Sequence, residues 1–268
     1  MLIRRQQRRS AGGGGIRLII GVIVAIFAII SFLTSQEFNP ITGENQHLSL
    51  TTDQEIALGL QSAPELIREF GGEYPDRDVQ AAIDRIGFDL VENSVARETP
   101  WRFEFTVLDD QQTINAFALP GGQVFITAAM LAELDTEDQV AGVLAHEIVH
   151  VLARHSAQAI AKSELTNGLI GAVGVASGEA SAAQTAYMIG QLINMSYGRD
   201  AEYQSDTLGV CLMIDAGYDP EGMVGVMQVL EAASGGGGQP EFFSTHPNPG
   251  NRVEAIREAI ATAPERCP

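Results

Sequence analysis

The sequence is poor in positive charge. It has 16 Lys and Arg residues against 34 Asp and Glu residues, which gives a formal net charge of −18 at pH 7. Five of the basic residues lie before residue 18, and no acidic residue precedes Glu37, so the rest of the chain has eleven basic against 34 acidic residues, a net charge of −23. Such a chain repels nucleic-acid phosphates and anionic lipid headgroups. The composition therefore excludes a nucleic-acid partner.

Long apolar runs are also scarce. One uncharged run, residues 18–33, is long enough to cross a membrane when Ile16 and the stem of Arg17 are included. We expect an uncleaved anchor, because the run is longer than the usual core of a signal peptide and no Ala-x-Ala site follows Leu33. A cleaved signal peptide and, given the Arg-rich and acid-free start, an organelle transit peptide are the alternatives.

The anchor divides the chain into four parts. Residues 1–17 are basic and, by the positive-inside rule, are expected in the cytoplasm. Residues 18–33 cross the inner membrane once, and residues 34–50 are predicted to form a polar linker along its surface. Residues 51–268 form the main domain, on the periplasmic or extracytoplasmic side. With 45% hydrophobic residues in the chain, this part can bury one substantial core.

Cysteine is nearly absent. A periplasmic location would permit a disulfide between Cys211 and Cys267, the two cysteines of the chain. Cys211 also lies in an apolar helical pattern, which is typical of a buried free thiol. Both interpretations stay open.

Hydrophobic periodicity predicts an α+β fold that is mainly helical with one small sheet. Capping-box patterns predict helices that begin near Thr52 and Thr136. Alternation over residues 103–107 predicts a strand, and two short extended pieces flank Pro120-Gly121-Gly122. Further helices are expected over residues 76–95, 198–216, 220–233 and 251–261.

Two apolar segments, residues 168–176 and 185–193, are too short to span a membrane as helices. They are interpreted as packing helices or as a mobile flap over the site. The glycine-rich residues 234–238 are predicted to be flexible.

The pentapeptide His146-Glu147-Ile148-Val149-His150 lies in the helix that is predicted to begin near Thr136. Residues four apart share one helical face, so both imidazoles can reach one metal ion while Glu147 meets whatever the metal binds. Catalytic zinc commonly takes three protein ligands and leaves its fourth position to water. The pattern predicts a zinc hydrolase whose third ligand lies elsewhere.

The third ligand is not another histidine on the same helix, because Ser156-Ala157 occupy the positions where that pattern needs one. Glu202, on the predicted helix 198–216, is the interpretation that we favour. Asp206 lies four residues later on the same face, where it can accept the spare ring N–H of a histidine ligand and fix its orientation.

Four segments, in this order, resemble the M48 peptidases, a family that includes Ste24-like, HtpX-like and Oma1-like enzymes. The resemblance covers roughly residues 51–261, and the segments are NAFALPGG at 115–122, VLAHEIVH at 143–150, RDAEYQSD at 199–206 and STHP at 244–247. It implies a mostly helical, zincin-like domain that binds one Zn²⁺. Ste24-like and HtpX-like members have several membrane spans, so this chain looks like a short, singly anchored envelope member.

The resemblance also implies the roles of individual residues. His146, His150 and Glu202 would be the zinc ligands, Glu147 the catalytic base, and Asp206 the support of a histidine ligand. Zinc lowers the pKa of its bound water to about 7, and Glu147 would carry the proton to the leaving amine. Both histidines must be neutral to bind metal, so activity should fall in acid.

Substrate binding is expected near Gly122. If residues 123–126, with Val124 among them, form an exposed sheet edge beside the zinc helix, an extended polypeptide can pair with this edge through main-chain hydrogen bonds. The alternative is an ordinary sheet with a glycine turn. Asn115 is predicted to contact substrate backbone or to cap a turn.

His246 lies in the loop 244–250, which contains two prolines, Pro247 and Pro249. It is interpreted as a catalytic group that stabilises the oxyanion, as a transient fourth zinc ligand that keeps the enzyme latent, or as a structural residue. Arg252 serves the oxyanion or pairs with an acid. Arg154 and His155 follow the motif on the same predicted helix and are interpreted as structural.

These residues lead to two functional hypotheses. The first is a membrane-anchored zinc endopeptidase that acts on misfolded or unassembled envelope proteins. The second is a zinc-containing chaperone or assembly factor that holds extended chains and rarely cuts them.

Overall fold

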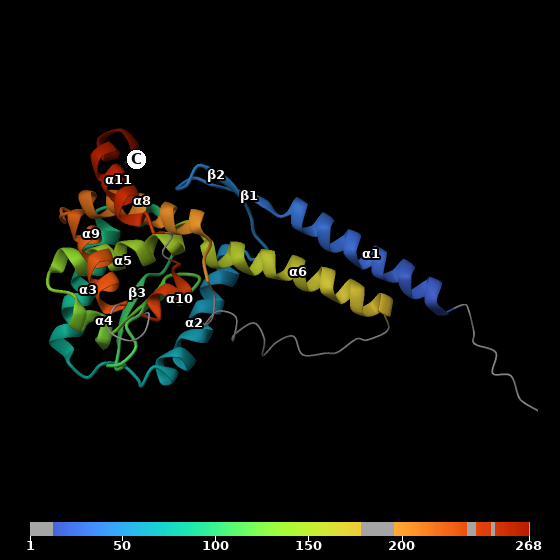
Figure 1. Ribbon diagram of the computed structural model, residues 1–268, viewed down its shortest axis with the longest axis horizontal. Helices are drawn as coiled ribbons and strands as arrows, with labels where there is room; N and C mark the ends of the chain where they lie inside the picture. Colours follow the sequence, from blue (N-terminus) through green and yellow to red (C-terminus); the bar gives the residue numbers. More distant parts are fainter. Residues whose placement is uncertain (1–12, 178–195, 235–239, 248–249, 268) are drawn as a thin grey trace, which may run out of the picture.

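The computed structural model describes residues 13–177, 196–234, 240–247 and 250–267. A globular body of helices around a small sheet carries two long helices that project from it side by side, α1 (Gly13–Thr34) and α6 (His155–Ser177) (Figure 1). The predicted fold class, mainly helical with a small sheet, is confirmed. The predicted flap segment 185–193 and nearly all of the glycine-rich stretch 234–238 lie outside the described residues.

Helix α1 contains the predicted anchor. Its residues Gly15–Thr34 are long and apolar enough to cross a membrane, and they are almost entirely exposed. Among the described residues, it is the one helix that meets this test of length and composition.

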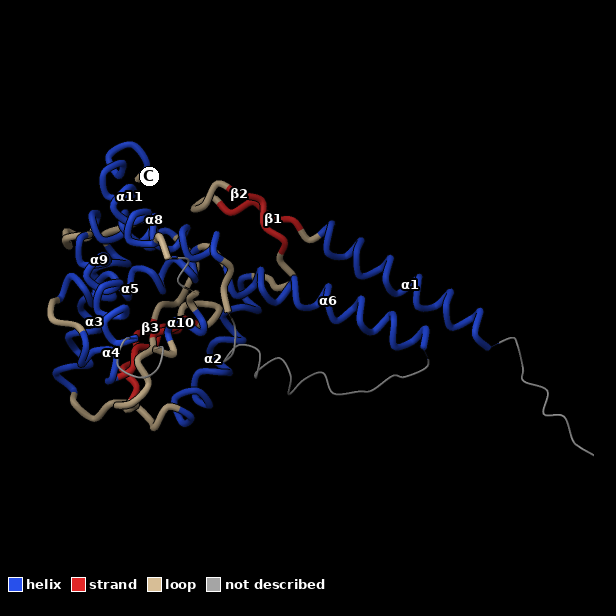
Figure 2. The backbone as a smooth tube through the Cα atoms, viewed as in Figure 1, coloured by secondary structure: helices blue, strands red, loops and turns tan. Residues whose placement is uncertain are grey.

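The segment 34–50, predicted to be a linker, forms a hairpin that docks on the body. Strands β1 (Gln36–Asn39) and β2 (Glu44–His47) pair antiparallel, between α1 and the body (Figure 2). The buried side chains of Asn39 and Gln46 donate to the carbonyl oxygens of Leu152 and Ala153, at 2.9 and 3.0 Å. These carbonyls end a helix and have no intrahelical partner. The hairpin was not visible in the sequence because its buried contacts are made by polar residues to a distant helix end.

The three-stranded sheet has the order β3-β5-β4. Strand β5 (Gln123–Thr127) lies in the centre, parallel to β3 (Glu104–Leu108) and antiparallel to β4 (Ala116–Ala118). The prediction of an exposed edge over 123–126 is therefore wrong, because both sides of β5 are paired and all its residues are buried. The turn before β5 needs glycine, since Gly121 and Gly122 have φ angles of 91° and 120°.

Helix α5 (Glu137–Leu152) forms the centre of the body, and its residues 141–152 are all buried. The other described elements are α2 (Thr52–Glu69), α3 (Arg77–Glu92), the 3₁₀ helix η1 (Val95–Glu98), α4 (Ala128–Glu133), α8 (Arg199–Asp215), α9 (Glu221–Ser234), α10 (Phe242–Thr245) and α11 (Arg252–Arg266). Helix α5 packs against α3, α8 and α9, and α11 packs on α8 and α9.

Local sequence signals explain several helix ends. Thr136 caps α5, and Gln139 completes the predicted capping box. The box of α2 forms one residue earlier than predicted, with Thr51 and Gln54. Of the two interpretations left open for the cysteines, the structure contains the disulfide, which joins Cys211 on α8 to Cys267 at the end of α11.

Candidate metal centre

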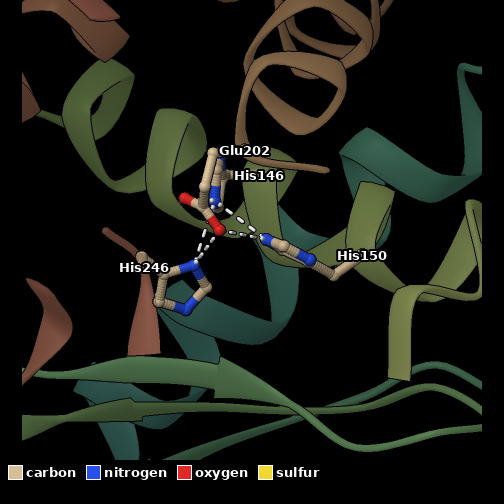
Figure 3. Close-up of side chains that lie close together, drawn as sticks. All are labelled: His146, His150, Glu202 and His246. Carbon is tan, nitrogen blue, oxygen red and sulfur yellow. Dashed lines mark hydrogen bonds and ion pairs between the residues drawn. The ribbon is translucent and has the colours of Figure 1, made fainter. Parts of the chain in front are cut away.

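Four side chains from three parts of the chain converge in the body (Figure 3). His146 and His150 project from one face of α5, with their Nε2 atoms 3.0 Å apart. Glu202 comes from the first turn of α8, and His246 directly follows α10. All four residues are buried, and their possible ligand atoms lie within 4.8 Å of one another.

The distances between these atoms fit one metal ion. His246 Nδ1 lies 3.3 Å from His146 Nε2 and 3.2 Å from Glu202 Oε1. His150 Nε2 lies 3.6 Å from the same Glu202 oxygen. Four atoms bound at about 2.0–2.1 Å around a tetrahedral zinc ion are roughly 3.4 Å apart, and zinc accepts imidazole and carboxylate ligands. The residues present therefore fit this ion.

Glu147 lies beside the cluster and is fully buried. Neither of its carboxylate oxygens makes a hydrogen bond within the described protein, and Oε1 lies 3.5 Å from His246 Nε2. Burial raises the pKa of Glu147 against the opposing charges of His246 and His146. A buried carboxylate without a hydrogen-bond partner is unfavourable for stability, which marks this glutamate as a functional residue.

Asp206 takes the position that the sequence predicted, behind His146. Its Oδ1 lies 3.0 Å from His146 Nδ1. Arg252 donates to both oxygens of Asp206, from Nε at 2.8 Å and from Nη2 at 2.7 Å, while its Nη1 lies 3.1 Å from Glu202 Oε2. Of the two roles considered for Arg252, the structure shows the ion pair with acids.

These contacts determine the protonation of the metal-free site. Burial alone would lower the pKa of His146, but hydrogen bonds to Asp206 and Glu202 outweigh it and raise the pKa to about 9. Burial would raise the pKa of Glu202, but the charge of His246 and the hydrogen bond from His146 hold it well below its usual range. The pKa of Asp206 is also lowered, because Arg252 outweighs the effect of burial.

His155 contacts His150, the second histidine of the motif. The sequence placed His155 on the same helix as the motif, but α5 ends at Leu152, Arg154 has a φ of 55°, and α6 begins at His155. This turn places His155 Nδ1 at 2.9 Å from His150 Nδ1. The contact between His155 and His150 was missed, because the sequence shows an unbroken helical pattern there.

Two aromatic rings stack on the cluster. Tyr197 stacks on His150 with ring centroids 4.0 Å apart, and Phe242 stacks on His246 at 4.4 Å. The backbone N–H of Tyr197 donates to the carbonyl of Thr245 at 3.0 Å, which joins the start of α8 to the residue before His246. No pattern in the sequence pointed to either ring. One feature of the sequence could have drawn attention to Tyr197: it directly precedes Gly198, the residue that caps α8.

Arg154 has the structural role that the sequence suggested. Its buried guanidinium donates to Glu55 Oε1 on α2 at 2.8 and 2.6 Å and to Glu37 on the hairpin at 2.7 Å. It thereby joins α2 and the hairpin to the end of α5.

The predicted substrate-binding residues do not gather on one surface. Val124 is 1% exposed in the central strand, and a Cβ on Gly122 would meet the backbone of Arg102 at 2.5 Å, so neither is available to a peptide. Asn115 directly precedes β4 and is buried, and its side-chain oxygen makes no hydrogen bond within the described residues.

Comparison with known proteins agrees with this geometry. The sequence profile described as "Peptidase family M48" matches residues 77–260, which is more than half of the chain. The chain belongs to the M48 peptidase family. This M48 peptidase is a metalloendopeptidase, and the four converging residues of the candidate centre all lie within the matched residues.

Among the relatives of this M48 peptidase are enzymes of mitochondria and bacteria. The mitochondrial metalloendopeptidase OMA1 of Schizosaccharomyces pombe is 29% identical over 235 residues, which cover 87% of this chain and 68% of the relative. The beta-barrel assembly-enhancing protease of Escherichia coli K12 is 31% identical over 240 residues, 85% of this chain and 48% of the relative. The chain thus spans about half the length of the second relative.

Proposed function

We propose that the protein is a zinc-dependent endopeptidase of the cell envelope. It is anchored once in the inner membrane by α1, with its catalytic domain on the periplasmic side. The observation that carries the proposal is the convergence of His146, His150 and Glu202 on one point, with Glu147 buried beside them and without a hydrogen bond to any described residue. An acidic chain beyond a basic N-terminus supports the orientation.

His146, His150 and Glu202 would hold the ion. When bound, zinc supplies a Lewis acid that acidifies water and polarises a carbonyl. Glu147 would then take the proton of the attacking water and deliver it to the leaving amine, and burial, which raises its pKa, favours proton uptake by this carboxylate. Asp206, held by Arg252, accepts the Nδ1–H of His146 and thereby fixes the ring.

His246 supports a closed resting state. Its Nδ1 stands where a fourth ligand would, and four protein ligands leave no position for water. Phe242 stacks on the ring and holds it there. His246 would therefore have to withdraw when substrate enters. The alternative is the oxyanion role predicted from the sequence, and the variant His246→Ala separates the two roles.

The substrate is a polypeptide bound in extended form. Strand β4 contacts α5 and is paired on one side, with β5, among the described strands. An extended segment can add to its other side through main-chain hydrogen bonds. This binding mode recognises the backbone of the substrate more than its side chains. The name of one relative refers to β-barrel assembly, so we propose misfolded or unassembled envelope proteins as the substrate class.

Replacing Glu147 by Gln tests the peptidase function. The purified full-length Glu147→Gln protein should keep one zinc ion, measured by mass spectrometry of the metal, and should lose casein cleavage. Glu133→Gln, which changes an exposed glutamate on α4, is the matched control and should cleave normally. Cleavage at the normal rate by zinc-loaded Glu147→Gln would refute the proposal. For the ligand set, Glu202→Ala should lose zinc, and undiminished tight binding would remove Glu202 from it.

A second candidate function is that of a zinc-containing chaperone. The position of His246 favours it, because a metal with four protein ligands has no place for water. Such a site would leave bound polypeptides uncut. In this case Glu147→Gln would suppress aggregation of an unfolded envelope protein as well as the unchanged chain does, and it would complement an envelope phenotype. Loss of complementation with retained zinc would favour the endopeptidase.

A further inference from the structure

We propose that the distal part of α6, residues Leu165–Ser177, is embedded in the bilayer beside α1, so that the protein holds the membrane with a pair of helices. The proposal rests on the anchoring role proposed for α1. It adds a second membrane element within the peptidase domain, directly after the helix that carries His146 and His150.

The first observation is the face of α1 that is covered. Between residues 15 and 34, the residues that are buried or partly buried lie on one helical face, because they are spaced three or four apart. They are Gly21, Val24, Ala25, Ala28 and Phe32. Helix α6 packs along this face, and the two helices lie side by side outside the body (Figure 1).

Small residues allow the two helices to approach closely. Gly168 and Ala172 lie four apart on α6, and a Cβ built on Gly168 would lie 2.9 Å from the Cβ of Ala28. Ala172 is 4% exposed. Small residues at four-residue spacing are typical of helix contacts in membranes, where close packing replaces the hydrophobic effect as the source of association.

Beyond Thr166 and Asn167, the exposed side chains described on α6 are apolar. Ile170 is 64% exposed and Leu169 37% exposed, and space is open around Gly171. In water such a projecting apolar surface is unfavourable. The exposed side of the neighbouring helix α1 is also apolar, with Ile26 50% and Phe27 73% exposed. One apolar environment around both helices would remove both surfaces from water. We infer that this environment is the hydrocarbon of the bilayer.

Charges disappear from both helices at the same level. On α6 the last described charges are Lys162 and Glu164, both exposed, and none occurs from Leu165 to Ser177. On α1 no charge lies between Arg17 and Glu37. The two helices run antiparallel and meet at Ala28 and Gly168, so the polar ends near Glu37 and Glu164 lie on the same side of that contact. Such a shared boundary is expected at a membrane surface.

A groove marks this boundary. It has a volume of about 570 Å³ and opens where α1, α6 and the residues after β2 meet. Its lining combines apolar and polar side chains, including Phe32, Leu48, Leu165, Ser31 and Glu164. This mixture suits the level at which lipid chains give way to headgroups.

The length of α6 sets the distance of the candidate metal centre from the membrane. The thirteen residues of the embedded part extend about 20 Å, roughly two thirds of a 30 Å hydrocarbon core, so this part enters the bilayer without crossing it. Leu165 lies ten positions after His155, which is about 15 Å along the helix. Because His155 contacts His150, the centre lies near the membrane surface. The substrate class is therefore narrowed to polypeptide segments close to the membrane.

Site-directed spin labelling tests the embedding. The full chain is reconstituted in vesicles of phosphatidylcholine and phosphatidylglycerol, with a nitroxide on Ile170→Cys and the native cysteines joined in their disulfide. Accessibility to oxygen, which is enriched in hydrocarbon, is compared with accessibility to a water-soluble nickel chelate. Ile26→Cys on α1 is the membrane reference, and Phe88→Cys on α3, with Phe88 43% exposed, is the reference in water.

We expect the label at residue 170 to have the same accessibilities as the label at residue 26. Its accessibility to oxygen should be several-fold above that of the label at residue 88, and its accessibility to the nickel chelate should be low. A label at 170 that matches 88, while 26 lies in hydrocarbon, would overturn the embedding of α6 and leave the anchor intact. A label shielded from both reagents would show a protein partner or a second copy on this surface and would also overturn it. Contact of both 26 and 170 with nickel would refute the anchor together with α6.

A matched pair of glycine variants tests the helix pair. Gly168→Leu should separate α6 from α1, because its Cβ meets Ala28, whereas Gly171→Leu points into open space. The distance between labels at 26 and 170, measured by pulsed electron spin resonance, should lengthen or broaden in the first variant and stay unchanged in the second. An unchanged distance in folded Gly168→Leu would contradict the pairing.

Discussion

His150 Nδ1 and His155 Nδ1 lie 2.9 Å apart, and one of them has to donate the hydrogen. A metal bound through His150 Nε2 leaves its Nδ1–H as the donor, so His155 Nδ1 accepts. His155 is neutral in this arrangement, because burial lowers its pKa to about 4. Its Nε2–H then donates to Gln204 Oε1 at 3.0 Å, and Gln204 donates to Glu44 on the hairpin at 3.2 Å. With a metal on His150, these hydrogen bonds would all run in one direction, from His150 to Glu44 on β2.

Replacing His155 should therefore weaken metal binding. His155→Phe removes the acceptor and leaves the buried His150 N–H unpaired, and we expect zinc affinity to fall about 10- to 100-fold. His155→Gln keeps an acceptor and should restore part of the affinity. Competition with a chelating dye measures both. Normal affinity in His155→Phe would show that the contact has no role in holding the metal.

Replacing His246 separates its two possible roles. If it closes the site, His246→Ala should cleave casein faster than the unchanged enzyme, because the fourth position becomes free while His146, His150 and Glu202 still hold zinc. Zinc content is measured in the same samples. A slower reaction at full zinc content would instead indicate stabilisation of the oxyanion.

Arg252 should contribute strongly to stability. Arg252→Met removes a buried cation that pairs with both Asp206 and Glu202, and breaking such a buried pair costs about 3–5 kcal/mol. The measurement is urea unfolding of the metal-free, detergent-solubilised protein. Arg85→Met is the matched control, because Arg85 pairs with Glu137 at an exposed site, and it should leave the free energy of unfolding nearly unchanged. Equal effects of the two variants would contradict the role of burial.

Stability should depend on pH through Glu55. Burial raises its pKa from 4.5 to about 7, against the opposing charge of Arg154. A carboxyl with a raised folded-state pKa adds stability below pH 4.5, and this stability is lost as the pH rises through about 7. Between pH 4.5 and 8 the free energy of unfolding of the unchanged protein should fall by up to about 3 kcal/mol more than that of Glu55→Gln.

Urea unfolding at several pH values measures this difference. Glu65→Gln is the control, because Glu65 is exposed on the same helix, and it should keep the pH dependence of the unchanged protein. If Glu55→Gln showed that same dependence, the ionisation of Glu55 would have no part in it.

Several local features were predictable because they depend on neighbours in the sequence. Thr136 and Gln139 are three residues apart and cap α5 as expected, and the five-residue motif places His146 and His150 on one face. Glu202 and Asp206 were predicted from their own spacing together with the family resemblance. Each signal lies within one or two helical turns.

Other features depend on contacts between distant segments. The hairpin of residues 36–47 is fixed by Asn39 and Gln46, which satisfy the end of a helix more than 100 residues away. Strand β5 became the central strand because β3 and β4 both pair with it, so the predicted edge at Val124 is buried. Neither pairing leaves a periodic pattern in the sequence.

By itself, the sequence determined the chemistry of the site: a helix with two imidazoles and a carboxylate at the spacing of one helical turn, in an acidic domain behind an apolar helix. The tertiary structure decided what surrounds that chemistry. It placed His246 as a fourth donor, Arg252 behind Asp206 and His155 behind His150, because burial, hydrogen-bond direction and charge pairing are settled where helices pack together.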